Sequence, residues 1–244
     1  MFRDLLIANA AKRSWSNLGY VSSGLVAAYD GQFNAGDALH DPMATTWADL
    51  SGHGYNINLS DHSFTWDSDC LVVTDTGGVS TGVARASVSD TMKYHTVEIV
   101  MVANSGSVGQ GDCAAGIWNT DRVAGSGYIG NNNSSGVQYR YQPSGTTNTN
   151  AVLSNVNTQT KAYWCGQTTS SRVYLYRRVG GSAEMSDNTS ASPTNEPGGI
   201  YLLGDGVSVW WFSGKIWAVR FYNRALGATE RATNYAIDAR RFGL

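Results

Sequence analysis

The sequence predicts an all-β protein: two antiparallel sheets packed as a jelly-roll sandwich, with a short helix at the C-terminal end. From Tyr20 onward, short strand-like runs alternate with clusters of Gly, Asn, Ser and Asp, which is typical of antiparallel sandwiches and not of βαβ repeats. The helical pattern in this part of the chain comes after Leu226. The chain has 244 residues and is 42% hydrophobic, so one sandwich can bury a substantial core.

Eight runs have the composition of strands: Leu25–Tyr29, Tyr55–Leu59, Phe64–Trp66, Cys70–Val73, Thr96–Val102, Arg172–Arg177, Ile200–Leu203 and Lys215–Tyr222. In the second run, apolar residues alternate with Asn56 and Asn58, so we expect one of its faces to contact water. The run Thr96–Val102 is almost continuously apolar. We therefore expect a central strand that is covered on both faces.

Residues 104–160 are rich in Gly, Ser, Asn and Thr, with islands of Trp, Tyr and Val. Small polar residues satisfy their own backbone groups in turns, so we expect strands joined by long surface loops. A disordered linker is the alternative, but the spaced aromatic and β-branched residues favour ordered strands.

The terminal segment has the signals of a helix. Gly227 can serve as the N-cap, Glu230 lies in the first turn, and Arg240 and Arg241 lie at the negative end of the helix dipole. The expected docking stripe consists of Ala232, Tyr235, Ala236 and Ala239. We expect this helix to pack on the sandwich in a structural role.

Residues 1–19 are predicted to be an N-terminal extension, and residues 20–244 the sandwich domain. Asp4 and Asn9 interrupt the apolar run Leu5–Ile7, so we expect the protein to be made without a signal peptide. No other apolar run approaches the ~20 residues that span a bilayer, and no membrane partner is predicted. Residues 2–13 of this extension are either a flap that packs on the sandwich, which we favour, or an attachment peptide.

Charge and cysteine content exclude several classes of protein. Lys and Arg number 17 against 19 acidic residues, and this net charge of −2 makes nucleic acid an unsuitable partner. Cys70, Cys113 and Cys165 are widely spaced and odd in number, which indicates neither a disulfide framework nor a zinc site. We expect buried free thiols.

Three segments carry a resemblance to a known family. Gly24–Asp30, Trp47–Gly54 and Phe212–Leu226 resemble the aliphatic-aromatic-Asp strand, the W-x-D-L-S-G-x-G motif and the F-S-G-x-I-x-x-V-R-x-Y-N-R-A-L motif of laminin-G-like modules in the concanavalin A-like lectin/glucanase superfamily. The resemblance implies that these segments include the first and last strands of one sandwich and that the two strands meet. His40–Trp47 and Asn234–Leu244 are similar to segments of such modules in phage tail or virion proteins and in gut bacterial surface proteins.

The carboxylates do not form the pair that glycoside hydrolysis needs. Glucanases of this superfamily commonly carry E-x-D-x-x-E on one strand. The glutamates of this chain are Glu98, Glu184, Glu196 and Glu230, and none has a second acid at i+2 or i+4. Glu98 is the one candidate for a catalytic acid. A lone carboxylate on an apolar strand, however, is more often paired with an arginine. We therefore predict no catalytic residue and no enzyme.

An acidic loop follows the first strand. Asp30, Asn34, Asp37 and Asp41 lie within a dozen residues and offer the hard oxygen ligands that Ca²⁺ prefers. Asp and Asn also cap turns in the absence of metal. We predict no cofactor, and calcium held by Asp30, Asp37 and Asp41 stays the alternative.

Aromatic side chains are abundant, with 8 Trp and 13 Tyr. Most should pack the core, and an exposed remainder would mark a contact surface for glycan or protein. Because side chains alternate along a strand, Tyr139 and Tyr141 share one face. The candidate carbohydrate-binding residues are Trp118, Tyr139, Tyr141 and Trp210.

The sequence thus favours a non-catalytic recognition or adhesion module of a virion, displayed in several copies, that binds a host surface carbohydrate. Its expected location is a virion or the outside of a cell, and its expected partners are a glycan or other host-surface ligand, other virion proteins and copies of itself. Two alternatives stay open: a purely structural tail or capsid decoration protein, and a glycoside hydrolase. The fold alone does not decide among them, because sandwiches of this kind host enzymes, lectins and scaffolds.

Overall fold

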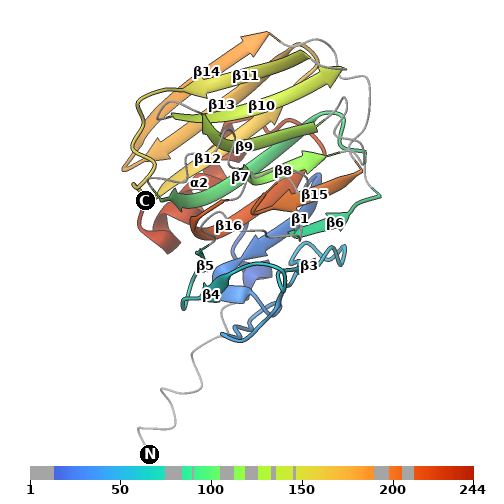
Figure 1. Cartoon of the computed structure of the whole chain (residues 1–244), viewed down its shortest axis with the longest axis vertical. Helices are drawn as coiled ribbons and strands as arrows, with labels where there is room; N and C mark the ends of the chain where they lie inside the picture. Colours follow the sequence, from blue (N-terminus) through green and yellow to red (C-terminus); the bar gives the residue numbers. More distant parts are fainter. Residues whose placement is uncertain are drawn as a thin grey trace, which may run out of the picture.

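The computed structural model describes residues 14–74, 84–89, 91–104, 113–118, 126–132, 136–144, 147–189, 198–204 and 212–244. In these ranges the strands form two antiparallel sheets that pack on a shared apolar core (Figure 1). The predicted all-β sandwich with a C-terminal helix is confirmed. Residues 2–13, the predicted flap or attachment peptide, lie outside the described ranges.

The larger sheet has eight strands in the described part of the chain, in the order β14-β13-β12-β7-β16-β5-β4, with β1 also paired to β16. Their bounds are β1 (Leu25–Asp30), β4 (Phe64–Trp66), β5 (Leu71–Val73), β7 (His95–Ala103), β12 (Ala162–Thr168), β13 (Arg172–Val179), β14 (Ser182–Thr189) and β16 (Gly214–Tyr222). Strands β1 and β5 pair with different halves of β16. The first and last strands of the sandwich therefore meet, as predicted.

The smaller sheet has the order β11-β10-β9-β8-β15-β6. Its strands are β6 (Ala84–Ser87), β8 (Cys113–Trp118), β9 (Ser126–Asn132), β10 (Gly136–Ser144), β11 (Thr147–Leu153) and β15 (Gly199–Leu202). The polar middle of the chain contributes β8 to β11, which confirms ordered strands there. Two 3-10 turns, η1 (Trp15–Asn17) and η2 (Gly31–Phe33), and the short pair β2 (Thr46–Trp47) and β3 (Ile57–Asn58) complete the N-terminal region.

Strand β7 is central and covered on both faces, as its sequence predicts. It pairs with β12 on one side and β16 on the other. Val97 and Ile99 belong to the core between the sheets. Glu98 and Val100 point to the opposite side, which helix α2 (Ala228–Phe242) covers.

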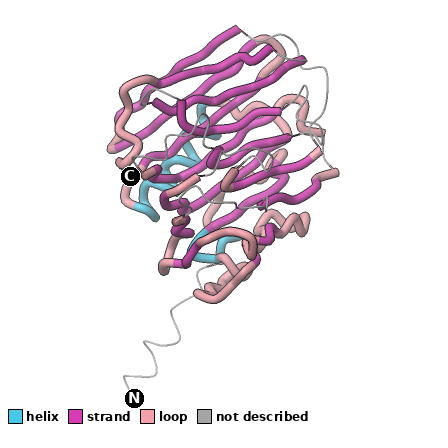
Figure 2. Tube along the Cα trace, viewed as in Figure 1, coloured by secondary structure: helices cyan, strands magenta, loops and turns pink. Residues whose placement is uncertain are grey.

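Helix α2 is capped by a glycine at each end, Gly227 and Gly243. The Gly227 N–H donates to Glu230 Oε2 at 2.8 Å, and Arg224 together with this bond lowers the pKa of Glu230 to about 2. Gly243 adopts φ 68° at the C-terminal cap, a left-handed conformation that glycine reaches without strain. Figure 2 shows this helix beside the layers of strands. None of the described helices has the length and apolar composition that crossing a bilayer requires.

The predicted docking stripe of the helix is only partly right. Tyr235 is buried, but Ala236 is exposed. The buried face consists of Asn234, Tyr235, Ile237, Asp238 and Phe242. It contains two polar side chains because these bond to charged groups that the sheet buries beneath the helix.

Candidate functional site

Two of the aromatic residues predicted to bind carbohydrate fill the core instead. Tyr139 and Tyr141 share a face, as predicted, but both are 0% exposed. The ring of Tyr139 fits because residue 166 is glycine: a Cβ there would lie 2.2 Å from Tyr139 Cδ2. Neither ring can therefore offer a face to a sugar at the surface.

A buried histidine holds the hydroxyl of Tyr139. His95 Nδ1 lies 2.8 Å from the Met92 carbonyl, so Nδ1 carries the proton and Nε2 accepts from Tyr139. Thr168 Oγ1 lies 2.9 Å from the same hydroxyl. Burial lowers the pKa of His95 to about 4, because the charged form would lose its hydration.

The side chains of the other two predicted aromatic residues lie outside the described part of the structure. Trp118 ends strand β8 opposite Gly199, and its side chain lies outside the described part of the structure. Trp210 also lies outside the described residues.

The three aspartates predicted as calcium ligands each bind a different partner within the protein. Asp30 is buried and ion-paired with Arg241. Asp37 accepts from the Trp15 N–H at 2.5 Å, and Asp41 accepts from the Met43 N–H at 2.8 Å. Within the described ranges no three His, Cys, Asp or Glu side chains are grouped as a metal site. Calcium at these residues stays a prediction.

The glycosidase candidate Glu98 lies in a buried polar network between the larger sheet and α2. Arg220 Nε donates to Glu98 Oε2 at 2.8 Å, and Asn234 Nδ2 donates to the same oxygen at 2.8 Å. Tyr163 donates to the other carboxylate oxygen. Glu98 is 0% exposed, so the expected arginine pairing is confirmed and no substrate can reach this carboxylate as the protein is folded.

The same network extends to the N-terminal part of the chain, through Tyr20 and Asp30. Arg220 also pairs with Asp238 of α2, and Tyr20 donates to Asp238 Oδ1 at 2.6 Å. Arg241 donates to the Tyr20 hydroxyl at 2.8 Å and pairs with Asp30. Burial raises the pKa values of Glu98 and Asp30, and the arginines oppose this rise. The network is a structural clamp between helix and sheet.

An exposed aromatic surface lies beside the clamp, on strand β13. We call it the β13 strip: Arg172, Tyr174, Tyr176 and Arg178, which share the face of the larger sheet that α2 partly covers. The alternate residues Val173 and Leu175 are buried in the core between the sheets. Tyr174 and Tyr176 are half-buried, and their rings are nearly parallel, with centroids 5.8 Å apart. The strip thus combines rigid backbone with partly open rings.

Helix α2 and strand β14 border the strip. Arg231 of α2 places its guanidinium carbon 4.0 Å from the Tyr176 ring centroid, and Nη1 donates to the Leu226 carbonyl and to Gln167 Oε1. Arg178 lies 5.0 Å from the Tyr235 ring centroid. On β14, Met185 stands opposite Tyr176 and is 57% exposed.

The arginines in and beside the β13 strip differ in whether they form an ion pair. Arg172 pairs with Asp187 of β14. No carboxylate among the described residues forms an ion pair with Arg178 or Arg231. The surface therefore presents two aromatic rings and two guanidinium groups without acidic partners.

Sequence reasoning predicted the strand Arg172–Arg177 but not its surface. The spacing of Tyr174 and Tyr176 already placed both rings on one face. The position of Arg231 had no local signal, because it depends on how the C-terminal helix docks on the sheet.

The comparisons agree with the fold. No protein family and no curated protein matches the sequence. Among solved structures, a Trypanosoma rangeli sialidase in complex with sialic acid is similar over 98% of this chain and 40% of that protein, with 12% identity and a TM-score of 0.62. The same sialidase with the inhibitor DANA is similar over 96% of this chain and 39% of that protein, with 14% identity and a TM-score of 0.62.

A third similar structure is the CBM40 domain of the Ruminococcus gnavus IT-sialidase bound to sialyllactose. The two structures match over 57% of this chain and 80% of that domain, with 14% identity and a TM-score of 0.45. The chain spans about two fifths of the Trypanosoma sialidase, and at such low identity the likeness shows the β-sandwich fold alone.

We expect Arg220→Met to destabilise the protein strongly. The substitution leaves Glu98 and Asp238 buried without their cation, which costs roughly 3–5 kcal/mol. Urea unfolding at pH 7 measures the loss. The control is Lys215→Met, which breaks the exposed pair with Asp67 and should cost at most about 1 kcal/mol. Equal small losses in both variants would show that the clamp does not stabilise the fold.

We also expect His95 to make the protein acid-sensitive. The unfolded chain takes up this proton near pH 6.5 and the folded protein near pH 4, so stability present above pH 6.5 is lost as the pH falls to about 4. The loss should be about 3 kcal/mol. Urea unfolding of wild type and His95→Gln between pH 7 and pH 4 tests this. The variant should have the flatter profile; parallel profiles would contradict the prediction.

Proposed function

We propose that this domain is a non-catalytic carbohydrate-recognition module and that the β13 strip is its binding surface. The observation that carries the proposal is the pair Tyr174 and Tyr176, held half-exposed on a sheet face and framed by arginines. Aromatic rings attract the apolar C–H faces of sugars, and guanidinium groups donate to sugar oxygens. Both kinds of contact lie on one rigid surface here.

The state of the carboxylates supports recognition over hydrolysis. Glu98, the candidate acid, is sealed by Arg220, Tyr163 and Asn234. Most glycosidases use a pair of carboxyl groups that flank the substrate, and sialidases, which use a tyrosine nucleophile, are an exception. The shared fold with a sialidase that was solved with sialic acid makes sialylated glycans natural first ligands to test.

The finer setting follows from the sequence resemblance to phage tail and virion modules. In this proposal the module is displayed in several copies on a virion, where it contacts other virion proteins and binds a carbohydrate of the host surface. The rival is a structural decoration protein that binds no sugar. An assay of glycan binding separates the two, because the rival needs no ligand.

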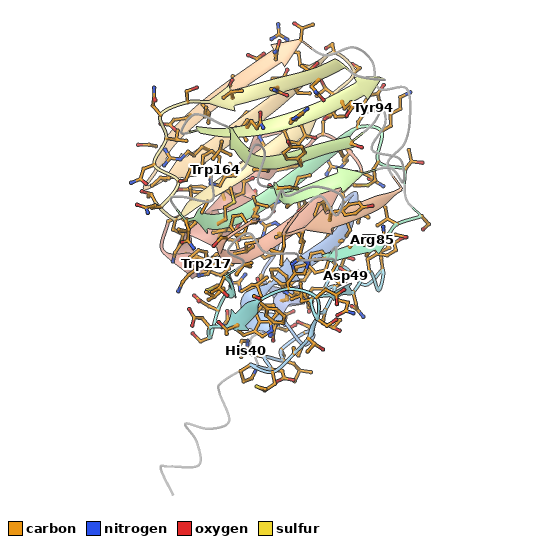
Figure 3. All side chains as sticks on the ribbon, in the orientation of Figure 1. His40, Asp49, Arg85, Tyr94, Trp164 and Trp217 are labelled. Atoms are coloured by element: carbon orange, nitrogen blue, oxygen red, sulfur yellow. The ribbon has the colours of Figure 1, made fainter. Side chains whose placement is uncertain are left out.

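We expect Tyr174→Ala to weaken glycan binding about tenfold, or about 1.4 kcal/mol, because it removes one stacking surface. A glycan array identifies ligands, and titration calorimetry compares the variants. The matched control is Tyr55→Ala, which removes another half-buried tyrosine whose ring stacks on His53. Its neighbour Asp49 lies at the lower right of Figure 3, away from β13 and β14 at the top of Figure 1.

The control should bind like wild type, and both variants should melt within a few degrees of it. A protein that binds no glycan, either on the multivalent array or by calorimetry at about millimolar ligand, would favour the structural rival. Equal losses in Tyr55→Ala and Tyr174→Ala would remove the β13 strip as the binding surface.

A further inference from the structure

We propose that the β13 strip selects saccharides that carry a carboxylate, and that Arg178 and Arg231 recognise this group. The inference rests on the proposed function and adds the class of ligand. Its basis is the unusual pairing of the arginines at the strip. Arg172 has an acidic partner on β14, whereas Arg178 contacts the Tyr235 ring and Arg231 contacts the Tyr176 ring and two neutral oxygens.

The two arginines add positive charge to this face, where the nearby acids Glu230 and Asp187 are already ion-paired with Arg224 and Arg172. The chain has a net charge of −2, and no acidic side chain in the described ranges is paired with Arg178 or Arg231. A guanidinium group matches a carboxylate through two parallel N–H donors. An anion at this position would supply the partner that the protein does not.

Arg231 is also pre-positioned for such a partner. Its Nη1 is held by the Leu226 carbonyl at 2.5 Å and by Gln167 Oε1 at 3.1 Å, and its plane is supported by the Tyr176 ring. No acceptor for Nη2 occurs among the described residues. A side chain that is already ordered loses little entropy on binding, which increases the affinity for a ligand that fits.

The neighbouring rings determine what must carry the carboxylate. Tyr174 and Tyr176 provide apolar surface next to the guanidinium of Arg231, so the ligand needs an apolar face and an anionic group close together. A sugar ring that bears a carboxylate has both. A highly sulfated polymer instead needs a broad basic surface, and Asp187 on β14 places an acid within this one.

The experiment compares three probes by titration calorimetry on the full chain: lactose, sialyllactose and a dextran sulfate oligosaccharide, which carries sulfates but no carboxylate. Wild type should bind sialyllactose about tenfold more tightly than lactose, which lacks the carboxylate. The difference should shrink when NaCl is raised from about 50 mM to about 500 mM, because salt screens exposed charges. Dextran sulfate should bind more weakly than sialyllactose, because its charge comes from sulfate groups alone.

Arg178→Gln and Arg231→Gln should each reduce sialyllactose affinity about fivefold or more and reduce lactose affinity by a clearly smaller factor, because lactose offers these arginines neutral oxygens and no carboxylate. Arg231→Lys keeps the charge but not the planar fork, so it should recover part of the loss at most. The control is Arg85→Gln on β6 of the smaller sheet, which makes the same change of charge at the right of Figure 3 and should bind like wild type.

The outcomes separate the two proposals. Binding of lactose and sialyllactose with equal affinity would overturn the carboxylate inference and leave carbohydrate recognition standing. Binding of no saccharide would overturn both. Tighter binding of dextran sulfate than of sialyllactose, or equal losses of lactose and sialyllactose affinity in both glutamine variants, would also overturn the inference. Thermal unfolding of each variant confirms that it is folded before its affinity is compared.

Discussion

The buried cation Arg220 is the constraint on which the rest of the structure depends. It lies 1% exposed between Glu98 of the sheet and Asp238 of the helix, and it contacts the Tyr20 ring at 4.3 Å. Removing an arginine from water is costly unless every donor is satisfied. Helix, sheet and N-terminal segment must therefore reach one relative position before this charge can be buried. The clamp makes the docking of α2 specific.

This docking also builds the candidate site. Arg231, Asn234 or Tyr235, Asp238 and Phe242 follow one another at helical spacing, so they share one side of α2. Once Asn234 and Asp238 are bonded to the clamp, Arg231 has to point down at the sheet, where it meets Tyr176. An interaction that stabilises the fold thus orients a side chain of the surface at the N-terminal end of the same helix.

Periodicity predicted the strands that have a one-sided or two-sided apolar pattern, such as β7 and β16, and it predicted where α2 starts. It missed β14 (Ser182–Thr189), in which only Ala183 and Met185 are apolar because this edge strand is mostly exposed. It also predicted an alanine stripe on α2, because apolar periodicity cannot reveal that Asp238 has a buried partner at Arg220 on a strand of the sheet. Local patterns predicted elements, and long-range charge pairing decided how they dock.

The candidate site was harder to predict for a related reason. Alternation shows that Tyr139 and Tyr141 share a face, and equally that Tyr174 and Tyr176 do, but not which face is covered. Tyr139 is covered because Gly127 and Gly166 leave room for its ring between the sheets. Tyr174 stays half-exposed because it lies on the other side of the larger sheet, beside Tyr176. Exposure is a property of the packed layers, which no single strand encodes.

A sheet face with two half-exposed rings and two guanidinium groups that have no ion pair among the described residues has consequences for affinity. Such a surface covers only part of a sugar, so each site can bury little area, and the ordered backbone reduces the entropic cost without adding contacts. Binding at one site should then be weak, and adhesion would require several sites that engage one surface together. Linked sites gain affinity through effective concentration with no new contact. Display in several copies, which the sequence predicts for this module, is the arrangement in which a surface of this kind becomes useful for adhesion.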